Sequence, residues 1–360
     1  MQILSSELEA PAISAAQPRF HALRVAEVVE ETPDARSFVF DIPPELAASF
    51  AYRPGQFLTL RVPVGGRNVL RCYSMSSAPT LDTRPRVTVK RVAGGRASNW
   101  LCEKVAAGDV LEAIPPAGVF SPRSLQGDFV LFAGGSGITP VFSILRSALA
   151  QGQGKLLLVY ANRDEKSVIF RERLRDLAAA HPGRLSVIHW LDSVQGVPAA
   201  AQLAELARAW GGAETFICGP GPFMDAAVAA LEAIGMDDER IHVERFVSLP
   251  DEDDVPTAKV SAVPDGAAVA ATLEVSLDGQ SHTLACDPGE TLLDAMLRSG
   301  VAAPFSCQAG MCASCMCQVQ EGSVHLRHNE VLDARDLARA WTLSCQAVAT
   351  SERVRVKFPE

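Results

Sequence analysis

Three cysteines near the C-terminus constrain the fold more than any other part of the chain. Cys307, Cys312 and Cys315 follow the spacing C-x4-C-x2-C, and Cys345 stands further along the chain. This is the plant-type spacing in which four thiolates hold the two irons of a [2Fe-2S] cluster. The residues between the three cysteines are small, so that a tight loop can turn backbone N–H groups toward the sulfurs. The spacing therefore predicts a one-electron carrier, which needs an electron source elsewhere in the chain.

The neighbouring Cys317 complicates the choice of ligands. It lies two residues after Cys315 and would be a substitute ligand for it. Only Cys315 completes the C-x4-C-x2-C spacing, however. We therefore expect Cys317 to be a packed residue on the strand that follows the loop.

The length, charge and composition of the chain argue against several classes of protein. Its 360 residues suffice for two or three domains, and the net charge of −9 argues against nucleic acid, whose phosphates need a basic surface. No run of about 18 uncharged apolar residues is present. The first 17 residues contain acidic side chains but no Lys or Arg, unlike a secretory signal. We expect a cytoplasmic monomer with no membrane partner, in which cysteines bind metal rather than form disulfides.

The first third of the chain has the pattern of a β-barrel. After a loose leader at 1–17, residues 18–124 contain short alternating runs separated by Pro, Gly and Asp turns. Such runs are typical of an antiparallel barrel or sandwich. The expected strands are 22–29, 37–41, 57–62 and 87–92.

Two motifs in this region have the chemistry of a flavin nucleotide site. In Arg71-Cys72-Tyr73-Ser74 the guanidinium can pair with a phosphate, the ring can lie on a flavin and the hydroxyl can reach its edge. In 94–101, glycines precede an expected helix N-terminus capped by Ser98, where free N–H groups suit a pyrophosphate. Taken alone, each motif also fits a purely structural role. The first could be a strand with a buried tyrosine, and the second a hairpin before a capped helix.

The middle third, residues 125–248, alternates expected strands with expected helices, which indicates a parallel sheet covered on both faces. The strand 128–132 is followed by a glycine-rich turn, 133–140, and then by a helix from 141. A strand, a glycine turn and a helix form a device that binds a dinucleotide pyrophosphate. A later strand ends at Cys218-Gly219-Pro220, and ligands bind beyond the carboxyl ends of such strands.

Arg163 bears on which nucleotide is used. It follows the second expected strand of this domain, 155–160, where it could hold the 2′-phosphate of NADPH, stack on the adenine, or pair with Asp164. An acidic residue at this point, Asp164 or Glu165, would instead bond a ribose hydroxyl and favour NADH.

The last part of the chain has its own pattern. Residues 249–271 are acidic and rich in alanine and proline, which predicts a linker. In 272–360, Asp278-Gly279 lies between two strand-like runs and predicts a hairpin. A short helix at 291–298 precedes the cysteine loop, and strands are expected at 316–320, 343–345 and 353–358. A compact domain of strands and helices is therefore predicted around the cysteines.

From about residue 18 onward, the motifs resemble those of one family, the oxygenase reductases of the ferredoxin–NAD(P)H reductase superfamily that end in a plant-type ferredoxin. The resemblance is carried by R-C-Y-S at 71–74, G-G-S-G-I-T-P at 134–140, C-G-P-G-P-F-M at 218–224 and the cysteine loop. The nearest branch is that of steroid-hydroxylase reductases, and the next is that of phenylacetyl-CoA epoxidase reductases. The resemblance implies three domains: an antiparallel β-barrel for FAD, an α/β parallel-sheet domain for NAD(P)H and a β-grasp ferredoxin domain.

The resemblance also implies roles for single residues. The cofactors would be FAD, a [2Fe-2S] cluster and NADH, with NADPH as the alternative, and the partner would be a terminal oxygenase. The residues that approach the reacting rings would be Tyr73, Ser74, Cys218, Glu244 and Phe246. The cofactor-binding residues would be Arg71, Tyr73, Ser74, Gly95, Ala97, Ser98, Gly134, Gly135, Ser136, Gly137, Thr139, Arg163, Cys218, Gly219 and Pro220, and the cluster ligands Cys307, Cys312, Cys315 and Cys345.

Two alternatives belong to other classes of protein. A regulatory protein could use the cluster as a redox switch, which sustained NAD(P)H-driven reduction of an artificial acceptor would exclude. Four thiolates also suit a tetrahedral zinc ion in an interaction module, although structural zinc sites more often use two pairs of closely spaced cysteines. A colourless, zinc-loaded protein would support that interpretation.

Overall fold

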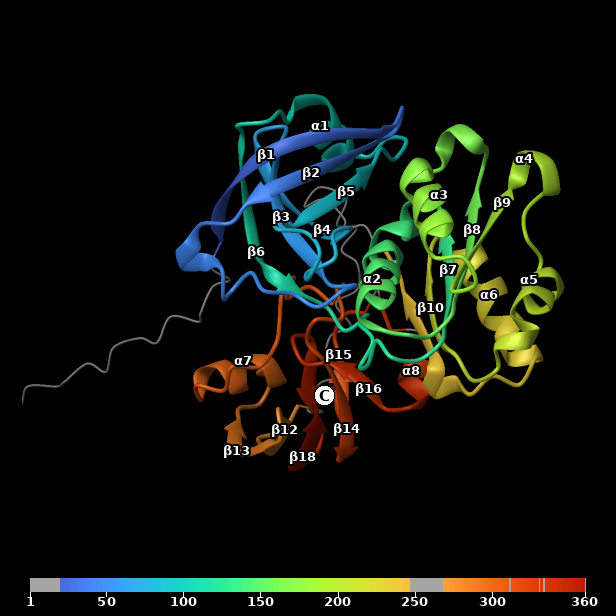
Figure 1. The fold of residues 1–360 in the computed structure, drawn as a ribbon. Helices are drawn as coiled ribbons and strands as arrows, with labels where there is room; N and C mark the ends of the chain where they lie inside the picture. The colour runs from blue at the N-terminus through green and yellow to red at the C-terminus, as the bar shows by residue number, and fades with distance from the viewer. Residues whose placement is uncertain (1–19, 247–267, 311, 330, 333, 360) are drawn as a thin grey trace, which may run out of the picture. The chain divides into compact units, whose positions relative to one another are not determined.

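The computed structural model describes residues 20–246, 268–310, 312–329, 331–332 and 334–359. Within them the chain forms three large sheets and one two-stranded ladder (Figure 1). The residues from Phe20 to Phe246 belong to one compact unit, and the third large sheet belongs to a second. The expected leader and residues 249–267 of the expected linker lie outside the described residues. None of the described helices is long and apolar enough to cross a membrane.

The first sheet is antiparallel throughout, in the order β4-β3-β6-β1-β2-β5. An isolated bridge between Met75, just after β4, and Val87 of β5 joins the two edge strands, so the sheet closes as a barrel. Buried side chains such as Phe38 and Leu58 fill its core. The elements are β1 (His21–Thr32), β2 (Ala35–Asp41), η1 (Pro44–Leu46), β3 (Phe57–Val64), β4 (Arg67–Ser74), β5 (Arg86–Lys90), α1 (Arg96–Lys104) and β6 (Val110–Ala117).

These elements confirm the predicted barrel, with one strand shorter than expected. The runs expected at 22–29, 37–41 and 57–62 lie within β1, β2 and β3. The run expected at 87–92 ends earlier, at Lys90, because the backbone then turns: the Gly95 N–H donates to the Val92 carbonyl at 2.9 Å.

The second sheet is parallel throughout, in the order β11-β10-β7-β8-β9. The strand order reverses between β7 and β10, and ligands bind beyond the carboxyl ends of the strands at such a point. The strands are β7 (Phe129–Gly134), β8 (Leu156–Asn162), β9 (Leu185–Leu191), β10 (Glu214–Cys218) and β11 (Ile241–Glu244).

Helices cover both faces of this sheet, as predicted (Figure 1). Leu131 of β7 packs in one apolar cluster with α2 and α3, whereas its neighbour Phe132 packs in another with α5 and α6. Helix α2 starts at Ile138 rather than at 141, since Pro140 in the first turn lacks an N–H that would be unpaired there anyway. The helical elements are η2 (Gly135–Gly137), α2 (Ile138–Gln151), η3 (Glu165–Ser167), α3 (Arg171–Ala180), α4 (Asp192–Gln195), α5 (Ala200–Ala207), η4 (Arg208–Trp210), α6 (Gly221–Ala233) and η5 (Asp238–Arg240).

The third sheet has the order β13-β12-β18-β14-β16, with β12 and β18 parallel and the other pairs antiparallel. Asp278 and Gly279 have positive φ angles of 49° and 74° and form the predicted hairpin turn between β12 and β13. Strands β15 and β17 form the separate ladder. The elements are β12 (Ala271–Leu277), β13 (Gln280–Cys286), α7 (Leu292–Arg298), β14 (Met316–Glu321), β15 (Val324–Leu326), α8 (Ala334–Ala338), β16 (Trp341–Leu343), β17 (Ala347–Ala349) and β18 (Arg353–Lys357).

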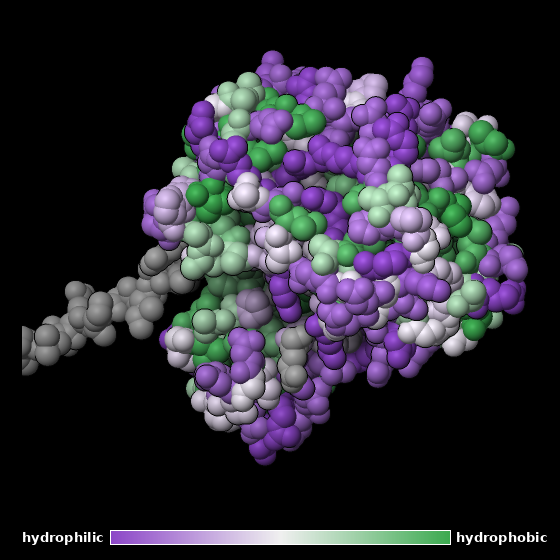
Figure 2. All heavy atoms as spheres, viewed as in Figure 1, coloured by the Kyte–Doolittle hydropathy of each residue, from purple (hydrophilic) through white to green (hydrophobic). Residues whose placement is uncertain are grey.

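Hydrophilic and hydrophobic residues are interspersed on the face of the molecule that Figure 2 shows. The large hydrophobic side chains that the described residues expose come from separate elements and loops; they are Leu81, Val92, Val110, Val194, Val197, Phe246 and Leu337. Single exposed apolar side chains of this kind are normal for a folded protein and do not mark a site.

Candidate functional site

Two turns meet at the carboxyl ends of the parallel strands. One is the glycine turn between β7 and α2, and the other is the turn Cys218-Gly219-Pro220 after β10. A Cβ atom added to Gly137 would lie 2.1 Å from the Cys218 carbonyl oxygen, and one added to Gly134 would lie 2.7 Å from Pro220 Cδ. Only residues without a side chain allow this approach. The structure therefore brings together the two turns that the sequence assigned to one nucleotide site.

Helix α2, which follows the glycine turn, has an uncapped N-terminus where the two turns meet. Gly137 is the N-cap of α2 and makes no side-chain cap hydrogen bond. The Thr139 hydroxyl donates to the Ser136 carbonyl oxygen at 3.0 Å, which fixes the turn, and the Tyr160 hydroxyl donates to the Gly135 carbonyl oxygen at 2.9 Å. Backbone N–H groups at the start of a 14-residue helix suit the charge of a pyrophosphate.

Cys218 and Glu244 end neighbouring strands and are register partners in β10 and β11. Cys218 is fully buried, and burial raises the pKa of its thiol well above the usual value. Burial also raises the pKa of the Glu244 carboxyl, to about 8, so the group is mostly protonated at neutral pH. Phe246, two residues further on, is 46% exposed. The structure thus places Cys218 and Glu244 side by side, where burial disfavours the charged form of both side chains.

The barrel motif Arg71–Ser74 forms the end of β4. Arg71 and Tyr73 alternate with Cys72 and Ser74 along the strand, so the guanidinium and the ring lie on one face. Tyr73 pairs with Leu58 of β3, and burial raises the pKa of its phenol. Arg71 Nη1 donates to the Leu70 carbonyl oxygen at 2.9 Å. A cation and a ring on one strand face have the chemistry that a flavin nucleotide needs.

Helix α1 corrects one prediction about this motif. Its N-cap is Gly95, without a side-chain cap hydrogen bond, so Ser98 is not the cap but the third helical residue. The Ser98 hydroxyl instead accepts from the Val92 N–H at 3.2 Å and closes the preceding turn. A Cβ on Gly95 would come within 2.7 Å of that hydroxyl, so a larger residue there would disturb the hydrogen bond to Val92. Ala97 and Ser98 are buried, and the uncapped N–H groups of the first turn suit a phosphate.

Hydrogen bonds and ring contacts fix the barrel against the parallel sheet. The Ser143 hydroxyl of α2 donates to the Ser77 carbonyl oxygen at 2.6 Å. Phe120, which follows β6, packs edge-on against Phe216 of β10 with ring centroids 5.1 Å apart. Arg146 of α2 forms two hydrogen bonds with Asp82. These contacts hold the two proposed nucleotide sites in one rigid framework.

Arg163 lies beyond β8, as expected, but its partner is not Asp164. Arg163 Nη2 is 3.2 Å from Asp34 Oδ2, in the turn between β1 and β2, and 3.2 Å from Ser167 Oγ. Asp164 Oδ1 accepts from the Ser167 hydroxyl at 2.9 Å and from the Ser167 N–H at 3.0 Å, and the hydroxyl bond is the main cause that lowers the pKa of the carboxyl. Lys90 Nζ lies 3.9 Å from the same Asp34 oxygen. Asp34 and Lys90 were not predicted as functional residues, because neither stands in a motif.

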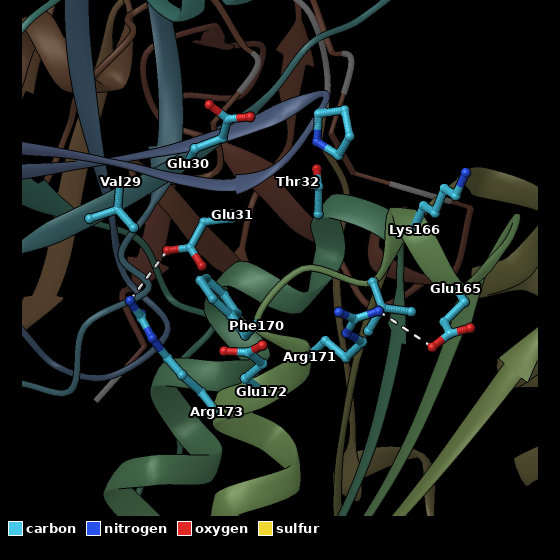
Figure 3. Close-up of a pocket in the computed structure, with 12 residues that line it drawn as sticks. Val29, Glu30, Glu31, Thr32, Glu165, Lys166, Phe170, Arg171, Glu172 and Arg173 are labelled. Atoms are coloured by element: carbon cyan, nitrogen blue, oxygen red, sulfur yellow. Dashed lines mark hydrogen bonds and ion pairs between the residues drawn. The ribbon is translucent and has the colours of Figure 1, made fainter.

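A separate open groove of about 470 Å³ lies between the end of β1 and the start of α3 (Figure 3). Charges of both signs line it, and Glu31 pairs with Arg173 at 3.5 Å across it. Glu165 and Arg171 form a second pair, at 3.3 Å. Of the residues predicted for the flavin, nucleotide or cluster sites, the lining of this groove includes Glu165, one of the two acidic candidates for the ribose.

The cysteine loop has a tightly turned backbone. Gln308, Gly310 and Ala313 have positive φ angles of 51°, 74° and 51°. A Cβ on Gly310 would lie 2.6 Å from the His328 carbonyl oxygen, so the loop requires glycine there. The Ala309 N–H points at Cys307 Sγ, at 3.4 Å, which is the N–H-to-sulfur arrangement expected from the small residues.

Two hydrogen bonds, one from a backbone N–H and one from a side chain, join the neighbours of Cys345 to this loop. The Ser344 N–H donates to the Cys315 carbonyl oxygen at 3.0 Å, and Gln346 Nε2 donates to the Gln308 carbonyl oxygen at 2.8 Å. Cys315 and Cys345 are both buried. Within the described residues, no three His, Cys, Asp or Glu side chains are placed to hold a single metal ion. A [2Fe-2S] cluster takes only two thiolates per iron, and this thiolate set fits its chemistry.

Cys317 lies in β14, as expected, opposite Thr342 of β16. It is fully buried in the apolar core of this domain, and burial raises the pKa of its thiol. We expect Cys317→Ala to keep the iron content and visible absorbance of the cluster, while lowering the free energy of unfolding by about 1 kcal/mol. Iron analysis and denaturant unfolding measure the two effects. Loss of iron in Cys317→Ala with retention in Cys315→Ala would reverse the assignment.

Family comparisons agree with the order of the three sites. The oxidoreductase FAD-binding domain matches residues 22–121, the oxidoreductase NAD-binding domain matches 131–229, and the 2Fe-2S iron-sulfur cluster binding domain matches 275–350. The chain therefore has a domain for each of the three expected cofactors.

Relatives match the chain over nearly its whole length. It is 53% identical to the ferredoxin reductase component of 3-ketosteroid-9-alpha-monooxygenase of Rhodococcus rhodochrous, over 93% of this chain and 96% of that one. It is 35% identical to one component of the 1,2-phenylacetyl-CoA epoxidase of Escherichia coli strain K12, over 94% and 98%. The solved structure of phthalate dioxygenase reductase covers 94% of this chain and 98% of its own, with a TM-score of 0.58 and 23% identity, and shows the shared fold. The chain therefore belongs to the family of oxygenase reductase components, NAD(P)H-dependent oxidoreductases that use FAD and a [2Fe-2S] cluster.

Proposed function

We propose that this protein takes electrons from NADH and passes them to the terminal oxygenase of a steroid monooxygenase. The support is the identity of 53%, over nearly the full length of both chains, with a reductase component of 3-ketosteroid-9-alpha-monooxygenase. The rival partner is an epoxidase acting on phenylacetyl-CoA, which rests on a relative of 35% identity. The cysteine usage favours a location in the cytoplasm, and we also propose that the protein is a monomer.

One observation carries the hydride-transfer part of the proposal. The turn after β7 and the turn after β10 are in backbone contact at the switch point of the sheet, where a Cβ on Gly137 would collide with the Cys218 carbonyl. A dinucleotide whose pyrophosphate lay on the N-terminus of α2 would therefore extend toward Cys218. Phe120 and Ser143 hold this sheet against the barrel that carries the flavin motif.

The chain would act on the nucleotides by binding and orientation. When bound, the flavin accepts a hydride from the nicotinamide and the cluster carries single electrons onward. Arg71 would hold a flavin phosphate, with the N-terminus of α1 from Gly95 to Ser98 as the second anion site. Tyr73 would cover the ring and Ser74 would bond its edge.

The nicotinamide end would be shaped by the strand termini and the exposed ring. Cys218, Gly219 and Pro220 would form the floor beneath the nicotinamide. Glu244, with a pKa of about 8, would lie beside it without a negative charge at neutral pH. Phe246 would cover the flavin from the other side.

The proposed cluster ligands are Cys307, Cys312, Cys315 and Cys345. The bent loop backbone and the tie from Ser344 to Cys315 support them. In this arrangement Gly310 would let the loop close, and the Ala309 N–H would stabilise the reduced cluster by donating to a sulfur.

Steady-state turnover of the purified protein tests the proposal. Oxidation of NADH and NADPH should be measured in parallel with an artificial acceptor, then with the oxygenases of a steroid monooxygenase and of a phenylacetyl-CoA epoxidase. We expect sustained NADH oxidation and productive coupling to the steroid oxygenase. Coupling to the epoxidase alone would favour the rival partner, and a single reduction without turnover would favour a redox sensor.

A further inference from the structure

The carboxylate that Arg163 contacts after β8 comes from the barrel, not from the nucleotide-binding sheet. The adenosine ribose of a bound dinucleotide is expected at the carboxyl end of the second parallel strand, here β8. In such sheets an acidic residue at this point favours a free 2′-hydroxyl, and an arginine accommodates a 2′-phosphate. The chain has both acidic residues and an arginine just after β8. The hydrogen bonds of these residues therefore show which of them are already engaged within the protein.

Asp164 is already engaged within its own turn. Its Oδ1 accepts from both the N–H and the hydroxyl of Ser167, at 3.0 and 2.9 Å. The carboxylate thus caps η3. Glu165, the other acidic candidate, is 73% exposed and pairs with Arg171. Neither carboxylate faces Arg163 as its hydrogen-bond partner.

Asp34 fills that role from the turn between β1 and β2. Its Oδ2 accepts from Arg163 Nη2 at 3.2 Å and lies 3.9 Å from Lys90 Nζ, so one carboxylate faces two cations. The turn is held firmly: Thr32 Oγ1 donates to Asp34 Oδ1 at 2.8 Å, and the Arg91 N–H donates to the Asp34 carbonyl oxygen at 2.7 Å. Asp34 is therefore a fixed charge rather than a mobile surface group.

The position of Lys90 links this cluster of charges to the nucleotide turn. A Cβ on Gly135 would lie 3.5 Å from Lys90 Nζ, so the ammonium group stands over the glycine turn. Lys90 is largely buried, with 19% of its side chain exposed; burial lowers the pKa of its ammonium group, and Asp34 partly offsets this effect. The Asp34 carboxylate consequently lies close to the glycine turn as well as to the end of β8.

We propose that Asp34 makes the protein select NADH over NADPH. The carboxylate pairs with the Arg163 guanidinium. It also places a negative charge where a 2′-phosphate would add about two further negative charges. A 2′-hydroxyl carries no charge and can donate to the same carboxylate. This inference rests on the proposed hydride transfer from a nicotinamide nucleotide, and it assigns the choice of nucleotide to a residue of the barrel domain.

The test uses the full-length flavin-loaded protein with an artificial acceptor. In Asp34→Asn, the Thr32 bond can persist while the charge is lost and Arg163 is released. We expect kcat/KM for NADPH to rise about tenfold, with kcat/KM for NADH changed less than about threefold. Inhibition by 2′,5′-ADP relative to 5′-ADP should strengthen by a similar factor, which reports binding independently of turnover. Adding Arg163→Ala to Asp34→Asn should remove both gains.

Glu31→Gln is the matched control, since Glu31 also pairs with an arginine between the barrel and the parallel sheet but lies in the groove of Figure 3. It should leave the NADPH-to-NADH ratio unchanged. An unchanged ratio in Asp34→Asn, or an equal shift in Glu31→Gln, would overturn the role of Asp34. Failure of the unmodified protein to turn over with either nucleotide would instead overturn the proposed function itself.

Discussion

Replacing Cys312 by serine is expected to stop electron delivery to the oxygenase while NADH still reduces the flavin. Cys312 is the central cysteine of the C-x4-C-x2-C loop, and its Sγ lies 3.3 Å from Ser314 Oγ in a buried position. A serine oxygen is a poorer ligand for iron than a thiolate, so the cluster should be lost or altered. Oxygenase-coupled turnover should fall by more than about a hundredfold.

The measurement compares two activities in one preparation. NADH-driven flavin bleaching should keep a rate within about threefold of the unmodified protein, because the FAD- and NAD-binding domains, at 22–121 and 131–229, do not include the cysteine loop. Cys286→Ser is the control: this cysteine is buried at the end of β13, outside the loop, and should leave both activities in place. Loss of both activities in a folded Cys312→Ser protein would contradict the proposed electron order.

Replacing Gly137 by alanine is expected to disable the nucleotide site. The new Cβ would lie 2.1 Å from the Cys218 carbonyl oxygen and 2.7 Å from the Gly219 nitrogen. These are backbone atoms of a buried strand end, so the two turns must move apart. Overpacking of this kind costs about 1–3 kcal/mol of folding free energy, and a misplacement of about 1 Å in a reacting pair can cost about a hundredfold in rate.

Thermal unfolding and single-turnover flavin reduction by NADH measure these two effects. Gly221→Ala is a close control, because Gly221 begins α6 beside the same turn and a Cβ there meets nothing within 4 Å. It should change neither quantity appreciably. Normal flavin reduction in Gly137→Ala would show that the contact between the two turns is not needed for hydride transfer.

Local chemistry made much of this site predictable from the sequence. Cysteine spacing, the glycine turn and R-C-Y-S each place several functional groups within a few residues, and the matching domains confirm the cofactors. Short runs of alternating polar and apolar residues predicted the strands of the barrel. Expected strands that alternate with expected helices predicted the parallel sheet. Ser98 was wrongly assigned as a cap, since serine can equally bond a preceding turn, here through Val92.

Contacts between distant residues were not predictable in this way. Asp34 and Arg163 are 129 residues apart, and their pairing depends on how the barrel packs on the parallel sheet. The sequence offered Asp164 as the nearer partner for Arg163, but Ser167 takes that carboxylate. The helix was expected from 141, after the turn that ends at Pro140, whereas α2 starts at Ile138, since a proline is tolerated in a first turn.

The central claim is that electrons pass from NADH to the flavin and from there to the cluster. Anaerobic stopped-flow mixing of the purified protein with NADH tests it most directly, with flavin and cluster absorbance followed at separate wavelengths and cluster reduction checked by electron paramagnetic resonance. The account predicts that the flavin bleaches first and that the cluster is reduced afterwards, with no cluster reduction in protein stripped of FAD. Cluster reduction by NADH before flavin bleaching, or in the FAD-free protein, would contradict it.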